Sequence, residues 1–288
     1  MGLDSALELI ESVKDYRVLF VGDSIIDEYH YGHPLGKSPK EHIIPVKYTD
    51  KEIFSGGVVA AARHTKSFCK EVKVQMGDTV TRKVRVVDRI YLRKLSEVHY
   101  EEKRVGVPRN EFGFADVTVA ADFGHGAITH ADAVSLGKTC AFLAVNTQTN
   151  SSNIGFNLIT KYPRADYIVI DEFEARLAAG DREGHIEDVM HKLAHGRCEK
   201  FVVTLGVNGA IGYERGNFYK AKALTSQVVD TMGAGDAFFA VTAPMAKMGG
   251  VEDLLLVGNA AGALKTQIVG HREPVTKEAL IGYLKAHG

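Results

Sequence analysis

The sequence predicts an α/β protein whose mainly parallel β-sheet is covered by helices on both faces and carries a small antiparallel β lid. Short, nearly continuous apolar runs alternate with helical patterns along most of the chain, which is typical of strands buried on both faces. Two segments, 28–54 and 81–103, break this alternation, because they are rich in Tyr, Val, Ile, Lys and Arg and lack helical periodicity. The first pattern predicts the core and the second predicts the lid.

In chain order, the expected core begins with an amphipathic helix whose apolar positions are Leu3, Leu7, Ile10 and Val13. The apolar runs expected as core strands are 17–22, 117–122, 142–146, 167–171 and 201–206. Each run ends in a polar residue or glycine at the carboxyl edge of its strand, where parallel sheets bind ligands. The sequence therefore predicts a cleft lined by Asp122, Asn146, Asp171 and the turn after Thr204.

The two lid segments would leave strand edges and apolar side chains that need covering. We expect the cleft to cover one face of the lid and a second copy of the chain to cover the other, which predicts a homodimer through the lid. No internal repeat and no low-complexity linker divides the chain. We therefore expect one domain over 1–288, with the lid inserted in the α/β core.

Composition argues against several classes of function. The 288 residues carry a formal net charge of -1, so no basic field favours nucleic acid and no polybasic patch favours a membrane surface. No apolar run approaches the roughly 20 residues that a membrane span needs. The three cysteines lack CxxC spacing, so they are expected to be reduced thiols. The resulting expectation is a cytoplasmic protein that acts on a small molecule.

Two glycine-rich stretches resemble nucleotide-binding loops without meeting their requirements. In "YGHPLGKS" (31–38) the interval between the glycines is one residue too short for a P-loop, and Pro39 follows at once. The stretch "GVNGAIG" (206–212) lacks the spacing of a dinucleotide-binding loop. We expect neither stretch to act as the motif that it resembles.

The stretch "VDTMGAGDAFF" (229–239) runs from a glycine-rich turn into an apolar helix, with Asp236 at the start of that helix. The exposed N–H groups of a helix start attract any anion, whether it is a side chain or a ligand. Asp236 can therefore be a helix cap or a residue that takes part in chemistry, and the local pattern leaves both interpretations open.

Several motifs, in order along nearly the whole chain, resemble one family. "DTMGAGDAFFA" resembles the C-terminal signature of the ribokinase-like, or phosphofructokinase B, carbohydrate kinases. "GDSIIDEYHYG", followed by "SPKEHIIPV", is similar to the branch that includes heptose-phosphate kinases. Further matches are "FSGGVVAAA", "TRKVRVV", "ADFGHGA", "IDEFEARL" and "VVTLGVNGAIGY". The resemblance implies a Rossmann-like, ribokinase-like fold and transfer of the γ-phosphoryl group of ATP to a sugar hydroxyl.

That reaction needs a base for the hydroxyl proton and groups that offset negative charge. By resemblance, Asp236 is the base, and the backbone N–H groups of Gly233, Ala234 and Gly235 form an anion hole at the helix start. The same helix end is expected to hold Asp236 ionised at pH 7.

On the substrate side, Asp27 matches the family carboxylate that accepts hydrogen bonds from sugar hydroxyls, although a turn or helix cap would also place an aspartate there. Gly56 and Gly57 match the glycine pair that lets backbone approach the sugar, while an ordinary strand-to-helix turn is the alternative. A phosphate on the substrate could be reached by Lys83 and Arg85, or these charges simply form a solvated strand face. Asp122, at a strand end, is expected to contact the substrate, and a turn histidine is the simpler interpretation of the nearby His125.

On the nucleotide side, Asp171 and Glu174 fall on the family's Asn-x-x-Glu motif, which organises Mg²⁺ and phosphates through water. An acidic first helical turn is the alternative interpretation. The remaining residues implied at the nucleotide are Thr204, Gly206, Gly209, Thr231 and Asn259. An ordinary helix residue is the alternative interpretation of Asn259.

The chain also departs from the family pattern. Ala60 stands where the glycine-pair signature continues to a sugar-contacting asparagine, and Asp171 replaces the asparagine of the magnesium motif. After "EVKVQMG" the chain passes almost directly to "DTVTRK", so a helix-and-strand unit is expected to be missing. Near the third strand, "NTQTN" replaces an Asp-Pro-Lys-type turn.

Three functions remain open at this point: an active sugar or sugar-phosphate kinase, a non-catalytic relative that binds nucleotide or sugar and regulates a partner enzyme, and an unrelated α/β enzyme such as a nicotinamide-dependent one. Retention of "GAGD" favours the first over the second, and the absence of GxGxxG argues against the third.

Overall fold

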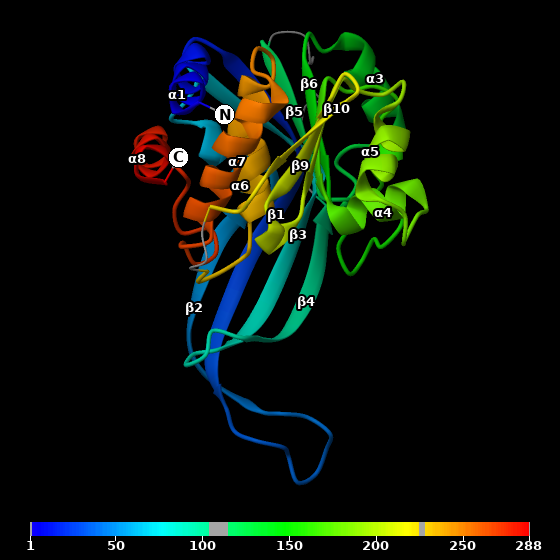
Figure 1. Cartoon of the computed structure of the whole chain (residues 1–288). Coiled ribbons are helices and arrows are strands. Elements are labelled where there is room, and N and C mark those ends of the chain that lie inside the picture. The colour runs from blue at the N-terminus through cyan, green and yellow to red at the C-terminus, as the bar shows by residue number, and fades with distance from the viewer. Residues whose placement is uncertain (1, 104–114, 225–227, 288) are drawn as a thin grey trace.

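The computed structural model describes residues 2–103, 115–224 and 228–287. Within these residues ten strands form one sheet (Figure 1). Nine of them follow the order β10-β9-β8-β7-β6-β5-β1-β3-β4, and β2 pairs with the C-terminal part of β1. The central strands β1, β5, β6, β7 and β8 are mutually parallel. This arrangement confirms the predicted mainly parallel sheet.

The helices are α1 (Leu3–Ser12), α2 (Gly57–Thr65), α3 (His130–Thr139), α4 (Glu172–Ala179), α5 (Ile186–Ala194), α6 (Ala234–Met245), α7 (Val251–Lys265) and α8 (Lys277–His287). The strands are β1 (Arg17–Pro34), β2 (Val46–Gly56), β3 (Glu71–Asp88), β4 (Lys94–Lys103), β5 (Val117–Asp122), β6 (Leu143–Thr147), β7 (Tyr167–Asp171), β8 (Lys200–Thr204), β9 (Ala210–Glu214) and β10 (Asn217–Ala221). Two short 3-10 helices, η2 (Ile159–Lys161) and η3 (Gly206–Asn208), lie in the connections.

Two hydrophobic cores cover the two faces of the sheet. Side chains of α1, α2, α6, α7 and α8 pack on one face, and those of α3, α4 and α5 pack on the other. All residues of β5 and β6 are buried, as the continuous apolar runs predicted. The burial of both faces confirms the doubly covered core and brings the carboxyl ends of the parallel strands to one edge.

The lid is an extension of the core sheet rather than a separate sheet. β1 and β3 each run unbroken from the core into the lid and stay parallel to each other from Arg17 to Gly32. β2 then pairs antiparallel with β1, and β4 pairs antiparallel with β3, which confirms the antiparallel lid strands. Because β3 passes directly from core to lid, no additional helix and strand separate the two parts. The P-loop-like stretch covers the last residues of β1 and the start of the protruding connection to β2, rather than a helix start.

Two absences concern the described residues alone. None of their helices is both long and apolar enough to cross a membrane. They also contain no group of three or more His, Cys, Asp or Glu side chains placed to hold a metal ion. The extent of a single domain over 1–288 stays a prediction.

Candidate active site

A cavity of about 400 Å³ opens at the carboxyl edge of the sheet, beside the start of α6. Its volume lies within the range of small-ligand pockets. The lining is largely apolar and backbone, with few polar groups: Asp171, Thr204, Gly206, Val207, Gly209, Ala223, Leu224, Val228, Thr231, Ala234, Gly235, Phe238, Asn259, Gly262, Ala263 and Thr266. All the residues that the sequence implied at the nucleotide line this one cavity, except Glu174.

Local structure explains how these residues reach the cavity. Asp171 and Thr204 are paired at the ends of β7 and β8, so both stand at the sheet edge. The turn after Thr204 needs glycine, because Gly209 has a φ of 89° and a Cβ there would lie 2.0 Å from the Ala221 carbonyl oxygen. Asn259 comes from α7 and donates to the carbonyl oxygens of Ala221 (3.4 Å) and Lys222 (3.2 Å).

Asp236 does not cap α6. The N-cap is Gly233, with a φ of 76°, and no side chain forms a capping hydrogen bond at this helix start. The carboxylate of Asp236 instead accepts a hydrogen bond from Nε2 of Gln148. The helix start is thus left to Gly233, Ala234 and Gly235, as an anion hole requires.

Burial raises the pKa of Asp236 above its ordinary value, which runs against the expectation that the helix end sets its ionisation. The charge of His271, the Gln148 hydrogen bond and the charge of Lys265 oppose this rise. A carboxylate with a raised pKa is a stronger base than a solvent-exposed aspartate. Its surroundings therefore favour proton transfer more than simple capping.

Asp27 lies on the buried face of the lid, with 4% of its surface exposed. Its Oδ1 accepts a hydrogen bond from Nη1 of Arg85, and its Oδ2 lies 3.3 Å from Nε2 of His271. Burial alone would raise the pKa of Asp27, but the hydrogen bonds and charges of His271 and Arg85 bring it down to about 2. Asp27 is therefore a stable carboxylate, and its charge also acts on Asp236.

The predicted glycine pair has a steric explanation. A Cβ on Gly56 would lie 2.1 Å from Oδ2 of Asp27, and a Cβ on Gly57 would lie 2.4 Å from the carbonyl oxygen of Asp23. Gly57 also has a φ of 58°, which L side chains rarely adopt. Gly56 therefore lets the backbone approach Asp27, and Gly57 lets it approach Asp23.

The strand register orders the buried face of the lid into rows. Phe54, Asp27, Lys83 and His99 form one row across β2, β1, β3 and β4. Lys83 is 8% exposed and forms no hydrogen bond or ion pair with another described residue. Burial lowers its pKa, although the charge of Asp27 opposes this. The ammonium of Lys83 thus lies in the same row as Asp27 and has no carboxylate partner among the described residues.

Asp122 and His125 are placed differently. Asp122 is buried, and its carboxylate accepts hydrogen bonds from Tyr162 (2.8 Å) and Gly124 (3.2 Å) and pairs with Lys161. These contacts account for Asp122 as a support of the loop, and its substrate contact stays a prediction. Burial lowers the pKa of His125 to about 4, and its Nε2 is buried without a partner among the described residues.

Asp171 and Glu174 form a capping box at the start of α4. Oδ1 of Asp171 accepts from the Glu174 N–H (2.7 Å), and Oε2 of Glu174 accepts from the Asp171 N–H (2.9 Å). Burial, followed by the charge of Asp171, raises the pKa of Glu174 to about 8. Carboxylate oxygens suit Mg²⁺, and Asp171 is exposed to the cavity. Asp171 thus fits a metal held through water, and both residues serve as a helix cap; the metal role of Glu174 stays a prediction.

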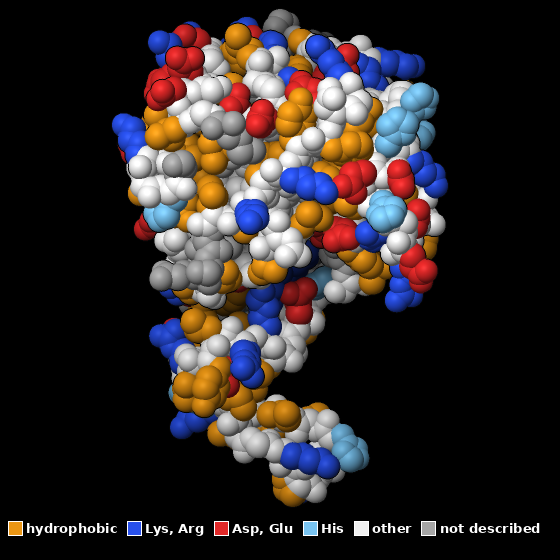
Figure 2. All heavy atoms as spheres, viewed as in Figure 1, with side chains coloured by type: hydrophobic (Ala, Val, Ile, Leu, Met, Phe, Trp, Pro, Cys, Tyr) orange, Lys and Arg blue, Asp and Glu red, His pale blue; other side chains and the backbone are white. Residues whose placement is uncertain are grey.

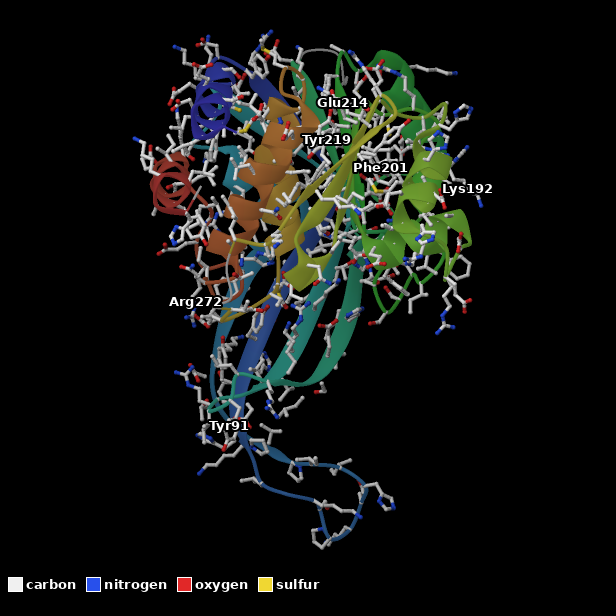
Figure 3. All side chains as sticks on the ribbon, viewed as in Figure 1. Tyr91, Lys192, Phe201, Glu214, Tyr219 and Arg272 are labelled. Atoms are coloured by element: carbon white, nitrogen blue, oxygen red, sulfur yellow. The ribbon has the colours of Figure 1, made fainter. Side chains whose placement is uncertain are left out.

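Three functional candidates escaped sequence reasoning. Gln148 comes from "NTQTN", which departs from the family pattern, and His271 and Lys265 come from the end of α7 and the loop after it. Lys265 donates to the carbonyl oxygens of Met232 and Gly270 beneath the glycine turn. The same loop reaches the lid, where Arg272, labelled in Figure 3, pairs with Glu52 at 2.8 Å. An isolated histidine or lysine in a loop carries no local sequence signal.

The fold and the site define an α/β protein with a ligand cavity beside a glycine-rich helix start and a charged lid. Residues 131–278, just over half of the chain, match the pfkB family of carbohydrate kinases. The chain belongs to this family, which confirms the resemblance stated from its motifs.

Individual relatives agree with this assignment. The chain is 25% identical over 271 residues to the bifunctional protein HldE of Desulfatibacillum aliphaticivorans, a match that covers 78% of this chain and 54% of that protein. The chain therefore spans about half the length of this relative. Escherichia coli phosphofructokinase-2 in complex with potassium has a similar fold, with a TM-score of 0.71, 13% identity and coverage of 94% of this chain and 100% of that one. Arabidopsis thaliana ribokinase complexed with ribose and ATP gives a TM-score of 0.65, 15% identity and coverage of 94% and 99%.

Proposed function

We propose that this protein is an ATP-dependent kinase that transfers the γ-phosphoryl group to a hydroxyl of a sugar or sugar phosphate. The observation that carries this proposal is the position of Asp236. It lies at the start of α6 without capping it, next to Ala234 and Gly235 of the cavity, and the charges of His271 and Asp27 act on it. Phosphoryl transfer from a nucleotide to a sugar requires a base that lies near both bound substrates.

The adenosine part of ATP fits the largely apolar cavity, with its phosphates directed to the start of α6. The sugar hydroxyl then attacks the γ-phosphorus, and the bond from that phosphorus to the oxygen of ADP breaks. Asp236 takes the hydroxyl proton, and the N–H groups of Gly233, Ala234 and Gly235 bind the negative oxygens of the phosphoryl group. Asp171 and Glu174 would hold Mg²⁺, which offsets phosphate charge when it is bound.

The lid row supports an anionic or strongly hydrogen-bonding substrate. Asp27 supplies a carboxylate for hydroxyl groups, and Lys83 supplies a buried ammonium without a partner among the described residues. Ala60, which replaces the family asparagine, lies beside His271 in a small hollow. We propose that His271 contacts the sugar in place of that asparagine. Similarity to HldE and to ribokinase is consistent with either a phosphorylated or a free sugar.

Turnover with Asp236→Asn tests the proposal. ATP consumption is measured against a panel of sugars and sugar phosphates for the parent and the variant. Loss of the general base should lower kcat by about a hundredfold or more while nucleotide binding persists. The matched control is Asp253→Asn, which alters an aspartate at the corresponding position in the first turn of α7, where it accepts from Ser5. The control should keep full turnover, and equal turnover of Asp236→Asn and the parent would sink the proposed base.

One observation favours a second function, that of a regulatory subunit that binds nucleotide or sugar without turnover. Both oxygens of Asp27 already pair with Arg85 and His271, so a sugar must compete with these partners. ATP binding without phosphorylation of any sugar in the panel would favour this alternative.

We further propose a homodimer through the outer face of the lid. Ile53, Glu28, Val84 and Val98 lie in one row across that face, and the apolar side chains of Ile53 and Val98 are about half exposed. Figure 2 shows apolar side chains, interspersed with Lys and Arg, on the lower lobe that the lid forms. Exposed apolar side chains on one face favour association.

A further inference from the structure

Lys265, at the end of α7, is a completely buried ammonium held by carbonyl oxygens. It has no exposed surface, and its Nζ donates to Gly270 (2.7 Å), Met232 (2.9 Å) and Ile268 (3.3 Å). In the part of the chain that the structure describes, Lys265 forms no ion pair with a carboxylate. Removing an ammonium from water is unfavourable unless other groups replace its hydration. Three carbonyl oxygens do so here.

The carbonyl shell joins the glycine turn to the loop that carries His271. Met232 precedes Gly233, while Ile268 and Gly270 precede His271. Asp230 joins the same two segments from another direction, because it accepts from the N–H groups of Met232 (3.0 Å) and Gly270 (2.9 Å). A lysine that merely capped α7 would bind the carbonyl groups of its own helix end. The bond to Met232 in addition joins Lys265 to the turn that precedes α6.

Lys265 also lies next to the anion hole. A Cβ on Gly233 would lie 3.3 Å from Cε and 3.7 Å from Nζ of Lys265. The charge of Lys265 acts on Asp236, the neighbouring base. A positive charge fixed beneath this turn stabilises negative charge that develops above it, and it needs no reorganisation during the reaction.

We propose that Lys265 is a tethered cation of the anion hole, which takes the place that a free monovalent cation would have in a shell of carbonyl oxygens. Carbonyl oxygens in such a shell replace the water around K⁺ in other proteins. Lys265 is a positioning residue, because it acts through the turn from Met232 to Gly235. Phosphoryl transfer by this protein should therefore need no added monovalent cation. This inference rests on the proposed kinase activity.

The parent protein gives the first test. Its kcat is measured in tetramethylammonium chloride and again after replacement by KCl, NaCl or NH₄Cl at constant ionic strength. If Lys265 supplies the cation, kcat should change by less than about twofold between these salts, because the positive charge is already in place. Strong activation of the parent by K⁺ or NH₄⁺ would overturn the inference. Absence of turnover with every sugar would count against the kinase activity instead.

Lys265→Ala gives the second test. Loss of the fixed charge should lower kcat by about tenfold or more, and NH₄⁺, K⁺ or methylammonium should restore part of it by entering the vacated shell. The same ions should raise the Tm of the Lys265→Ala variant and leave that of the parent unchanged, which is a readout independent of activity. Lys265→Arg tests whether charge without the compact shape is enough. A Lys265→Ala variant that keeps full kcat would refute the inference.

Lys200 provides a matched control. Its Nζ donates to the carbonyl oxygens of Ala246 and Gly249, both at 2.7 Å, beyond the opposite end of α6. Lys200→Ala should lose stability without a change in kcat, and added cations should not alter its turnover. Cation rescue of both variants would show a general salt effect and would contradict the assignment. If Lys265→Ala does not fold, the cation response of the parent decides.

Discussion

The cavity half of the site presents backbone and small side chains, whereas the lid half presents ionised side chains that already pair with one another. Around the cavity, Thr204, Gly209 and Asn259 leave an open, largely apolar space. In the lid, Arg85 bridges Asp27 and Glu97, and His271 contacts Asp27 from the core side. The shape of the backbone therefore defines the cavity half, and charged side chains define the lid half.

This difference teaches where each kind of specificity can arise. A space lined by backbone and apolar groups accepts a ligand without first breaking internal bonds. The paired charges of the lid must be rearranged or shared when a substrate binds, so only a ligand with matching polar groups regains their energy. The lid half should therefore discriminate among substrates more sharply than the cavity half.

The largest expected effect on stability comes from breaking the lid charges. Arg85→Met should lower the free energy of unfolding by about 3 kcal/mol, because it leaves Asp27 buried with one cationic partner fewer. Since the pKa of Asp27 is held at about 2, below its ordinary 3.8, this stability is present above about pH 4 and is lost as pH falls toward 2. Urea unfolding measures both effects.

The control is Arg82→Met, which removes a half-buried guanidinium that pairs with Glu28 on the outer face of the lid. It should change the free energy of unfolding by about 1 kcal/mol or less. Equal losses for the two variants would contradict the contrast between the two faces.

A smaller effect is expected in the cavity half, and it separates activity from stability. A Cβ on Gly235 would meet no atom within 4 Å, so Gly235→Ala should fold and gain roughly 0.5–1 kcal/mol of helix stability. The methyl group would nevertheless crowd the anion hole and lower kcat by about tenfold. Gly282→Ala in α8, which is equally open, should show the same gain in Tm with unchanged kcat.

The pH dependence of stability isolates Glu174. Its pKa is raised from the ordinary 4.5 to about 8, so its protonated form is favoured in the folded protein. The contribution of Glu174 to the free energy of unfolding is fully present below about pH 4.5 and is lost as pH rises through about 8. Glu174→Gln should flatten the decline in unfolding free energy between about pH 5 and 8. Glu172→Gln, on the exposed side of the same helix start, should leave the slope as it is in the parent.

The smallest change in stability is expected on the outer lid face. Val98→Lys should shift a dimer to a monomer in light scattering after size exclusion, with a change of about 0.5 kcal/mol or less in monomer unfolding. Val98 pairs with Val84 in the register and is 47% exposed. A monomeric parent would dispose of the proposed interface.

The core strands and the cavity residues could be predicted because their signals are local. Buried runs predicted β5 to β8 to within about two residues, and their polar ends predicted which side chains share an edge. The glycines at 206 and 209 are explained by backbone conformation, which a single position can reveal.

The lid pairing and the cation beneath the turn could not be predicted in the same way. The parallel pairing of β1 with β3 depends on strands that are far apart in sequence. Gln148, Lys265 and His271 act through partners at distant positions, and none of them belongs to a spacing motif. Burial also decided the pKa of Asp236, and burial of a helix start is a tertiary property.

Because β1 and β3 run unbroken from core to lid, the lid is a rigid extension of the core sheet and is not joined to it by a flexible hinge. β1 loses its pairing with β5 after Gly22, and its register with β3 shifts between Gly22 and Ser24. The lid part of β1 therefore begins at this point, where the core holds the strand in place. Asp27 lies a few residues beyond this point on β1. A force on the lid, such as contact with a second copy, would therefore bend the strand that carries Asp27 and change the position of this carboxylate.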